Sequence, residues 1–311
     1  MKQKQVFKVS AHLMGNQFEI SAVSENEDWA SERINAGINE IKRIEKLLTT
    51  FDDSSETNLI NRNAGIEAVK VSEETFSLIE RSIRISNITQ GAFDITYGSI
   101  DKSLWNFDTT MKSLPDEENA KQMVRLIDYR NIILDDKNKT IFLKEKGMRI
   151  GFGGIGKGYA AEMAKKIMQQ MGVESGVVNA SGDLTAWGLQ PNGEEWTIGI
   201  ANPNYSGQVF SFMKITGLAV ATSGNYEKFI LIDGKKYSHT INPRTGLPVT
   251  GIKSVTIITK NAEIADAMAT PVTIMGVKAG LHMINQIKDI EAIIIDDNDK
   301  IFTSNNIRLN K

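Results

Sequence analysis

The chain has 311 residues, of which 41% are hydrophobic and 24% are charged, a balance typical of a globular protein with a large core. Lys+Arg 36 and Asp+Glu 38 give a formal net charge of -2, so no basic excess is available to hold a nucleic-acid backbone, and nucleic acid is excluded as a partner. The absence of cysteine excludes disulfides, thiolate metal ligands, thiol nucleophiles and a lipid-bearing N-terminal cysteine.

The N-terminal region alternates apolar and polar residues, which predicts a strand rather than a signal peptide. No window has the length of apolar sequence that a membrane span needs, so this chain is not expected to insert into a membrane. As given, the sequence is expected to be cytoplasmic, or periplasmic or exported if an N-terminal signal has been removed from it.

The first third predicts a strand hairpin followed by helices. Residues 27–50 carry isoleucine and leucine at helical spacing, and a second helix begins after Ser72 and ends at Gly91. Residues 51–65, between these helices, are predicted to be a polar, turn-rich loop. Residues 101–120 are polar and irregular, which indicates a surface excursion or linker within a single unit spanning residues 1–311.

Strands dominate the second half of the chain. A helix over 117–127 leads into two short strands within 131–143, and a further helix runs from Gly156. The strands that follow are expected within 175–181, 196–201, 209–222, 228–241 and 253–260. A helix over 262–276 and strands within 278–287 and 290–304 complete the chain. Hairpins outnumber strand-helix alternations, so the predicted fold class is α+β, with largely antiparallel sheets flanked by helices.

The glycine-rich segment 151–160 (GFGGIGKGYA) fits two nucleotide-binding motifs by eye. A dinucleotide-binding fold needs a buried apolar strand before the glycines, but charged residues interrupt residues 141–150. A phosphate loop needs a hydroxyl after Lys157, where this chain has Gly158. Two interpretations remain: tight packing at a helix entry, or an anion site made by free helical N–H groups together with Lys157.

Other candidate residues are weak signals when taken singly. His239 lies where a strand enters a turn rich in proline and glycine, whereas His12 and His282 are assigned structural roles. Asp266 and Thr270 are four residues apart on a predicted helix and present two oxygen ligands on one face, as a magnesium site needs. Glu263, one turn earlier, either extends that site or faces solvent.

Two apolar strands end in small polar residues that suit backbone contact with a ligand, or plain turns. One end runs from Asn179 to Asp183 and the other from Thr222 to Asn225.

Eight segments, taken together and in this order, resemble the ApbE family, the FAD:protein FMN transferases, also called flavin-trafficking proteins. They are LMGNQFEI, LLTTFDDSSETNLINRNAG, TQGAFDITYGSI, IGFGGIGKGYAAE, VVNASGDLTAWG, AVATSGNYEKF, HTINPRTGLPV and ADAMAT, and they span residues 13–270. The resemblance implies an α+β fold with internally duplicated α/β units. It also implies an enzyme that uses FAD and magnesium to transfer FMN to a threonine or serine hydroxyl of another protein, with release of AMP. The implied acceptors are flavoprotein subunits of electron-transport complexes.

The resemblance also assigns site residues. The implied FAD contacts are Met14, Phe51, Ala92, Phe93, Asp94, Lys157, Ser223 and Ile241. The implied metal ligands are the Gly154 carbonyl, Asp266 and Thr270. His239 is the candidate base for the acceptor hydroxyl, since the usual histidine pKa suits proton transfer near neutral pH, and Asp266 orients or assists it.

The sequence departs from the family pattern at Gly151, Ser181 and Asn242, where the family has an acid, a glycine and an acid. Two alternatives to the transferase stay open. One is a metal-dependent FAD pyrophosphatase that yields FMN and AMP, since water can replace the acceptor hydroxyl. The other is a non-catalytic FAD-binding protein, which the change at Gly151 makes plausible.

Overall fold

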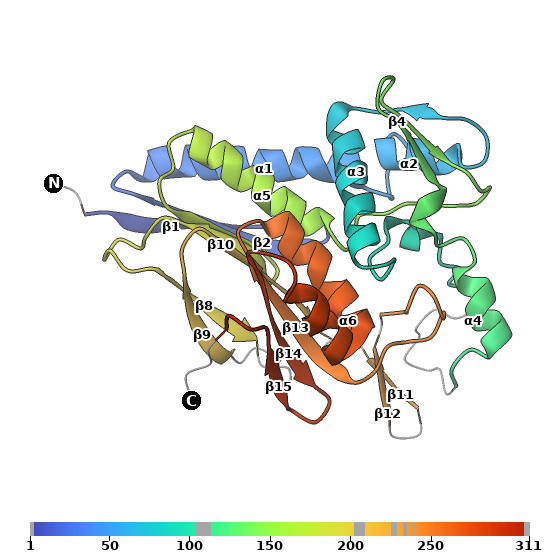
Figure 1. Cartoon of the computed structure of the whole chain (residues 1–311). Coiled ribbons are helices and arrows are strands. Elements are labelled where there is room, and N and C mark those ends of the chain that lie inside the picture. Colours follow the sequence, from blue (N-terminus) through green and yellow to red (C-terminus); the bar gives the residue numbers. More distant parts are fainter. Residues whose placement is uncertain are drawn as a thin grey trace.

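The computed structural model describes residues 3–103, 113–201, 209–224, 229–232, 235–238 and 240–307. A large sheet, covered by long helices, makes up most of the molecule, and a smaller part with its own short strands lies beside it (Figure 1).

The large sheet contains eight strands in the order β1-β2-β6-β7-β10-β13-β14-β15. Their bounds are β1 Gln5–Leu13, β2 Asn16–Ser24, β6 Gly176–Ala180, β7 Asp183–Trp187, β10 Leu218–Gly224, β13 Ile252–Thr259, β14 Ile290–Asp296 and β15 Ile301–Thr303. Every neighbouring pair is antiparallel. The predicted class, α+β with largely antiparallel sheets, is therefore confirmed.

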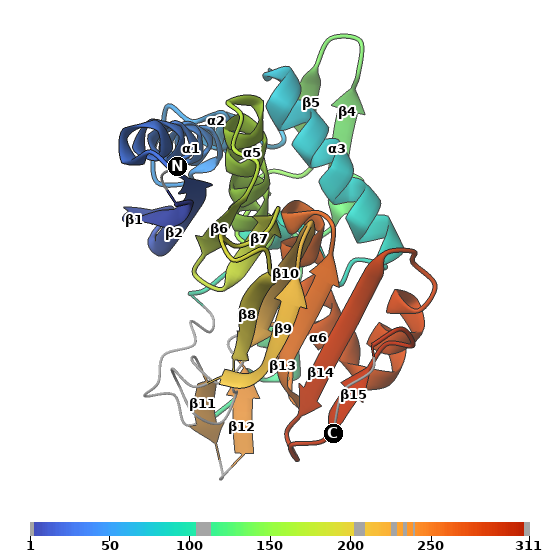
Figure 2. The ribbon, with the colours of Figure 1, turned by 90° about the vertical axis from the view of Figure 1, so that its left-hand side faces the viewer.

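Three long helices pack on one face of this sheet: α1 (Glu27–Leu48), α5 (Gly156–Gln170) and α6 (Ala262–Ile284) (Figure 2). Helix α1 follows from its sequence because Asn26 caps its N-terminus and its isoleucines recur on one face. Ile34, Ile41 and Ile44 on that face are fully buried in the main core.

The hairpin of β8 (Trp196–Ala201) and β9 (Val209–Ile215) packs on side chains of the central strands that do not belong to the main core. Leu184, Val220 and Ile258 of the large sheet form a second core with Trp196 and Ile215 of this hairpin. Since side chains alternate along a strand, the central strands are apolar on both faces. A further hairpin consists of β11 (Phe229–Ile232) and β12 (Lys235–Ser238).

The smaller part is built around the three-stranded sheet β3-β5-β4. Its strands are β3 (Val69–Lys70), β4 (Ile132–Asp135) and β5 (Thr140–Leu143). Its helices are α2 (Glu56–Arg62), α3 (Glu73–Ile88), α4 (Glu117–Val124) and the short 3-10 turns η1 (Ile95–Ser99) and η2 (Tyr129–Asn131).

Two element predictions are wrong. The loop predicted over 51–65 contains α2, which is too short to show periodicity and is stabilised by the Ser55 cap, whose side chain accepts from Asn58 N–H. The strand predicted within 278–287 is instead the end of α6, which resumes after a break at Gly276 (φ 81). Within 101–120, the last residues open α4, and residues 104–112 lie outside the described part.

In the part of the chain that the structure describes, no helix combines the length and the apolar character that a membrane crossing requires.

Candidate active site

The first turn of α5 is held by a carboxylate from α6. Ile155, which precedes the helix, provides no side-chain cap, and Asp266 Oδ2 accepts the Gly158 N–H at 2.9 Å instead. The Lys157 N–H also bonds to Asp266. Because a helix N-terminus carries partial positive charge, this carboxylate is well placed there. These N–H groups are therefore not free for a ligand, contrary to the interpretation of the glycine-rich segment as an anion site made by free helical N–H groups.

Gly158 is required for this arrangement. A β-carbon at this position would lie 2.2 Å from the Ala262 carbonyl oxygen and 2.6 Å from Asp266 Cβ. The two helix N-termini approach each other so closely that no larger residue fits between them. By contrast, a β-carbon at Gly151 would meet nothing within 4 Å, so packing does not require glycine there.

Lys157 and Asp183 form an ion pair beside Asp266. Lys157 Nζ lies 2.5 Å from Asp183 Oδ2, and the two side chains are 27% and 6% exposed. Asp183 opens β7, and it also accepts the backbone N–H of Thr222 on β10. Lys157, Asp183 and Asp266, here called the buried charge cluster, thus join α5, β7 and α6.

The buried charge cluster carries more negative than positive charge when both carboxyls are ionised. Burial raises the pKa of Asp183, although Lys157 opposes this. Burial and the neighbouring Asp183 charge raise the pKa of Asp266 to about 7. A further cation beside the two carboxyls would favour their ionised forms and lower both pKa values.

A second buried ion pair supports the cluster. Lys165 Nζ lies 2.7 Å from Glu162 Oε1, with side chains 12% and 7% exposed. Glu162 Oε2 accepts the Ala262 N–H at 3.0 Å, and Lys165 also reaches Thr185 Oγ1 at 3.3 Å. This pair therefore fixes α5 against the first turn of α6 and against β7, the elements that carry the buried charge cluster.

Glu263 does not face solvent. Its carboxylate is buried and binds Arg81 of α3, with Arg81 Nε 2.6 Å from Glu263 Oε1. Tyr159 of α5 donates to Glu74 of α3 at 2.6 Å. These contacts join the smaller part of the molecule to the helices of the active site.

Several residues assigned to FAD or metal lie around the start of α5. A β-carbon at Gly154 would lie 3.6 Å from Phe93 Cε2, and one at Gly156 would lie 3.6 Å from Met14 Cε. Ser223 follows Thr222 on β10, beside the Asp183 contact. Thr270 is partly buried and lies one helical turn beyond Asp266 on α6.

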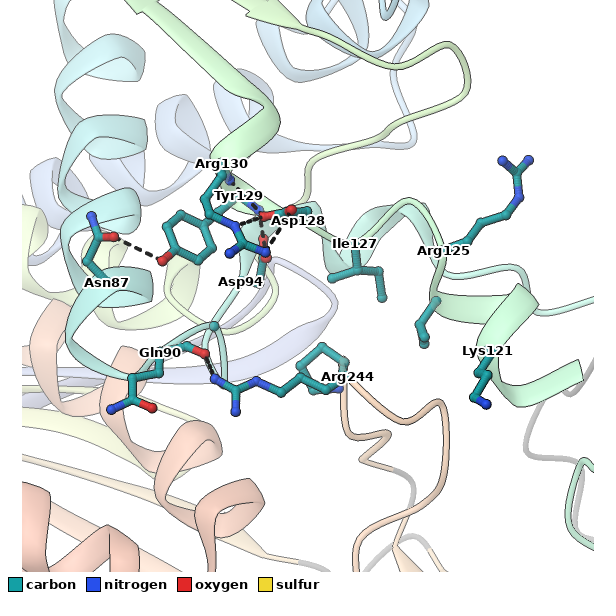
Figure 3. Close-up of a pocket in the computed structure, with 13 residues that line it drawn as sticks. Asn87, Gln90, Asp94, Lys121, Arg125, Ile127, Asp128, Tyr129, Arg130 and Arg244 are labelled. Atoms are coloured by element: carbon teal, nitrogen blue, oxygen red, sulfur yellow. Dashed lines mark hydrogen bonds and ion pairs between the residues drawn. The ribbon is translucent and has the colours of Figure 1, made fainter. Parts of the chain in front are cut away.

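Asp94 and Ile241 belong to a neighbouring region. The Asp94 carboxylate accepts a hydrogen bond from Tyr129 N–H (Figure 3) and two more from Thr96 N–H and Thr96 Oγ1. Burial raises its pKa to about 6 in spite of them. The buried Ile241 donates its N–H to Tyr97 Oη at 3.3 Å. Ala92 is buried beside Phe93.

One predicted site residue is not brought into this arrangement. Phe51 is 99% exposed in the loop between α1 and α2. His239, the candidate base, lies outside the described residues, between the buried Ser238 and Thr240.

Asp183, Glu162 and Lys165 are not assigned to the site from the sequence. Asp183 had a signal, because it stands in the polar end of an apolar strand. Glu162 and Lys165 had none, since an acid and a lysine three residues apart are typical of an exposed helix face.

The overall fold defines the class of protein to which the chain belongs. The crystal structure of the ApbE protein from Thermotoga maritima superposes with a TM-score of 0.86 at 30% identity, covering 96% of this chain and 97% of that one. The flavin transferase ApbE from Vibrio cholerae has the same fold, with a TM-score of 0.84, 24% identity and 97% of each chain covered.

The sequence comparisons identify the family. The model of the ApbE family matches residues 14–294, so this chain belongs to the ApbE family. A relative from Klebsiella pneumoniae (strain 342), named FAD:protein FMN transferase, is 32% identical over 99% of this chain and 95% of its own length. A relative of the same name from Vibrio cholerae is 27% identical, over 96% of this chain and 91% of its own length.

Proposed function

We propose that this enzyme is an FAD:protein FMN transferase, which transfers the FMN moiety of FAD to a threonine or serine hydroxyl of an acceptor protein and releases AMP in a magnesium-dependent reaction. The observation that carries the proposal is the buried charge cluster at the start of α5, in a chain whose relatives bear this enzyme name. Transfer at phosphorus requires positioning of both substrates and neutralisation of phosphate charge.

The proposed reaction is a displacement at the FMN phosphorus of FAD. The acceptor oxygen forms a new bond to that phosphorus while the bond to the bridging oxygen of the pyrophosphate breaks. AMP leaves with this oxygen and its electron pair. The proton of the acceptor hydroxyl passes to a base, for which His239 is the candidate.

The chain's own residues have distinct proposed tasks. Lys157 neutralises phosphate charge, and Asp183 holds the lysine ammonium in place at 2.5 Å. Asp266 fixes the first turn of α5 through Gly158 and assists His239. Met14 and Phe93 lie against the glycine-rich segment and provide apolar contacts for the flavin side of FAD. Phe51, Ala92, Asp94, Ser223 and Ile241 are proposed to complete the FAD contacts.

Magnesium fits the residues of this site. Among the residues that the structure describes, no group of three or more His, Asp or Glu gathers to hold a metal. Magnesium, however, needs few protein oxygens, and Asp266, Thr270 and the Gly154 carbonyl are the proposed donors. A cation bound beside Asp183 and Asp266 would stabilise their ionised forms, which burial otherwise disfavours. Magnesium, when bound, would neutralise charge on the pyrophosphate.

The test is a product analysis with FAD, magnesium and a purified, unmodified acceptor subunit of an electron-transport flavoprotein. The proposal expects one AMP released for each covalently bound FMN, detected by flavin fluorescence of the denatured acceptor. Removal of magnesium by a chelator should stop both products, and added magnesium should restore them.

The same assay separates the alternatives. AMP and free FMN without labelled acceptor would indicate a pyrophosphatase. Bound FAD with neither product would indicate a non-catalytic flavin-binding protein. Either result would contradict the transferase proposal.

A further inference from the structure

A cleft of about 610 Å³ lies between the C-terminal end of α3, the segment from α4 to η2, and the turn around Arg244 (Figure 3). Val124, Ile127 and Pro243 provide apolar surface in it. A volume of this size is typical of ligand-binding pockets in proteins. The cleft is open to solvent, and its walls come from three segments that are distant in the sequence.

The cleft is rich in positive charge. Its cationic residues are Lys121, Arg125, Arg130 and Arg244, and its carboxylates are Asp94 and Asp128. This excess of cations contrasts with the formal net charge of -2 for the whole chain. The Asp94 carboxylate accepts hydrogen bonds from Thr96 and Tyr129, so its oxygens already have partners within the protein. We refer to this feature as the cationic cleft.

The charges at the rim are accessible to a partner. The Arg130 side chain is 75% exposed although it pairs with Asp128, and the Lys121 side chain is 69% exposed although it pairs with Glu117. Arg125 is also exposed, and Figure 3 shows its side chain extended at the outer end of the cleft. Exposed ion pairs contribute little to stability, so these cations can exchange their present contacts for carboxylates of another molecule.

The cationic cleft shares its walls with the proposed flavin site. Asp94 lines the cleft and directly follows Phe93, whose ring lies against Gly154. Arg244 lines the cleft three residues after Ile241, and its side chain donates to the Gln90 carbonyl at the end of α3. A molecule in the cleft is therefore in contact with segments that also border the site of transfer.

The geometry points to the cationic cleft as the docking surface for an acidic segment of the acceptor protein, next to the hydroxyl that receives FMN. This inference rests on the proposed transferase function. Charge complementarity favours an acidic segment, and the cleft is open to solvent, as the docking of a polypeptide requires. The pyrophosphate of FAD is instead assigned to Lys157 at the start of α5, so the two substrates use separate cationic groups.

The test is a double charge reversal, Arg125→Glu with Arg130→Glu, in the full-length enzyme. The matched control is Arg84→Glu with Lys214→Glu, two exposed cations that also pair with carboxylates but lie outside the cleft. The probes are FAD and an unmodified acceptor subunit, with steady-state transfer and equilibrium FAD binding measured for each enzyme. Circular dichroism melts of both double variants establish that they fold.

The expected result is a rise of about tenfold in KM for the acceptor in the Arg125/Arg130 variant, with kcat and FAD affinity within about twofold of the wild type. The control should match the wild type in all three quantities. An acceptor whose acidic residues beside the target hydroxyl are changed to amides should show little difference between wild type and the Arg125/Arg130 variant.

Two results would overturn the inference while leaving the transferase in place: an unchanged acceptor KM, or a parallel loss of FAD affinity, which would place FAD itself in the cleft. If the wild type transferred no FMN to any acceptor, the proposed function would fail, and this inference would fail with it.

Discussion

The buried charge cluster and the cationic cleft both gather charged side chains, but in different physical settings. In the cluster, Asp183 and Lys157 are 6% and 27% exposed, and the helices around them approach as closely as their backbones permit. In the cleft, Lys121 and Arg130 are largely exposed and their ion pairs are screened by water. Changes in the first region should therefore affect folding and chemistry, whereas changes in the second should affect recognition.

The largest expected effect follows from crowding at Gly158. Gly158→Ala should lower the free energy of unfolding by about 3 kcal/mol, since its β-carbon would overlap the Ala262 carbonyl and Asp266. Gly151→Ala, in open space seven positions earlier, should change it by less than about 0.5 kcal/mol. Urea denaturation measures both. Equal stabilities for the two variants would show that α5 and α6 do not pack this tightly.

The supporting ion pair permits a direct test of burial. Lys165→Met leaves Glu162 in a buried site without its cation and should lower the free energy of unfolding by about 3 kcal/mol. Lys121→Met removes the exposed pair with Glu117 and should leave the free energy of unfolding nearly unchanged. Thermal and urea unfolding provide the comparison. Similar losses of unfolding free energy in the two variants would mean that burial does not make the Lys165 pair more important for stability than the exposed Lys121 pair.

Asp94 lies between the two regions and should show a pH dependence. Its folded-state pKa of about 6 exceeds the ordinary aspartate value of 3.8, so the folded protein binds this proton more tightly than the unfolded chain does. The contribution of this carboxyl group to the free energy of unfolding is fully present below pH 3.8 and is lost as the pH rises through about 6. Relative to Asp94→Asn, the wild type should lose on the order of 2 kcal/mol between about pH 4 and pH 7. Urea titrations at several pH values measure this difference, and a constant difference would contradict the raised pKa.

The smallest expected effect is the response of recognition to salt. Raising ionic strength from about 0.05 M to about 0.5 M should increase the acceptor KM of the wild type about fivefold, because exposed charges are screened. The Arg125→Glu, Arg130→Glu variant should lose or reverse that dependence, because carboxylates then outnumber cations in the cleft. Titrations with the acceptor at constant FAD concentration measure the acceptor KM at each ionic strength. A salt-independent KM in the wild type would remove the electrostatic distinction between cleft and cluster.

The elements with long local periodicity were predictable from the sequence. Helix α1 follows from its isoleucine spacing and the first hairpin from its alternation, because both patterns lie within the element itself. Helix α2 has only 7 residues, too few to show a periodicity, and the end of α6 is separated from the rest by the break at Gly276. Tertiary packing decides the conformation of such short or interrupted segments.

The candidate site was predictable only where motifs marked it. Lys157 and Asp266 stand in segments that resemble the ApbE family, but the contact of Gly158 with Asp266 joins residues 108 positions apart. Asp183 joins Lys157 across 26 positions, and the Glu162 contact to Ala262 spans 100. Local spacing cannot reveal contacts of this kind, so the supporting carboxylates became visible only in the fold.

The measurement that tests the central claim most directly is the rate of covalent FMN transfer in Lys157→Met, with Lys166→Met as the control from the exposed face of α5. Loss of the cation at the proposed phosphate site should lower kcat by about 100-fold or more, while Lys166→Met should transfer at the wild-type rate. Equal rates of AMP release and acceptor labelling in Lys157→Met and the wild type would contradict the assignment of the buried charge cluster to phosphoryl transfer.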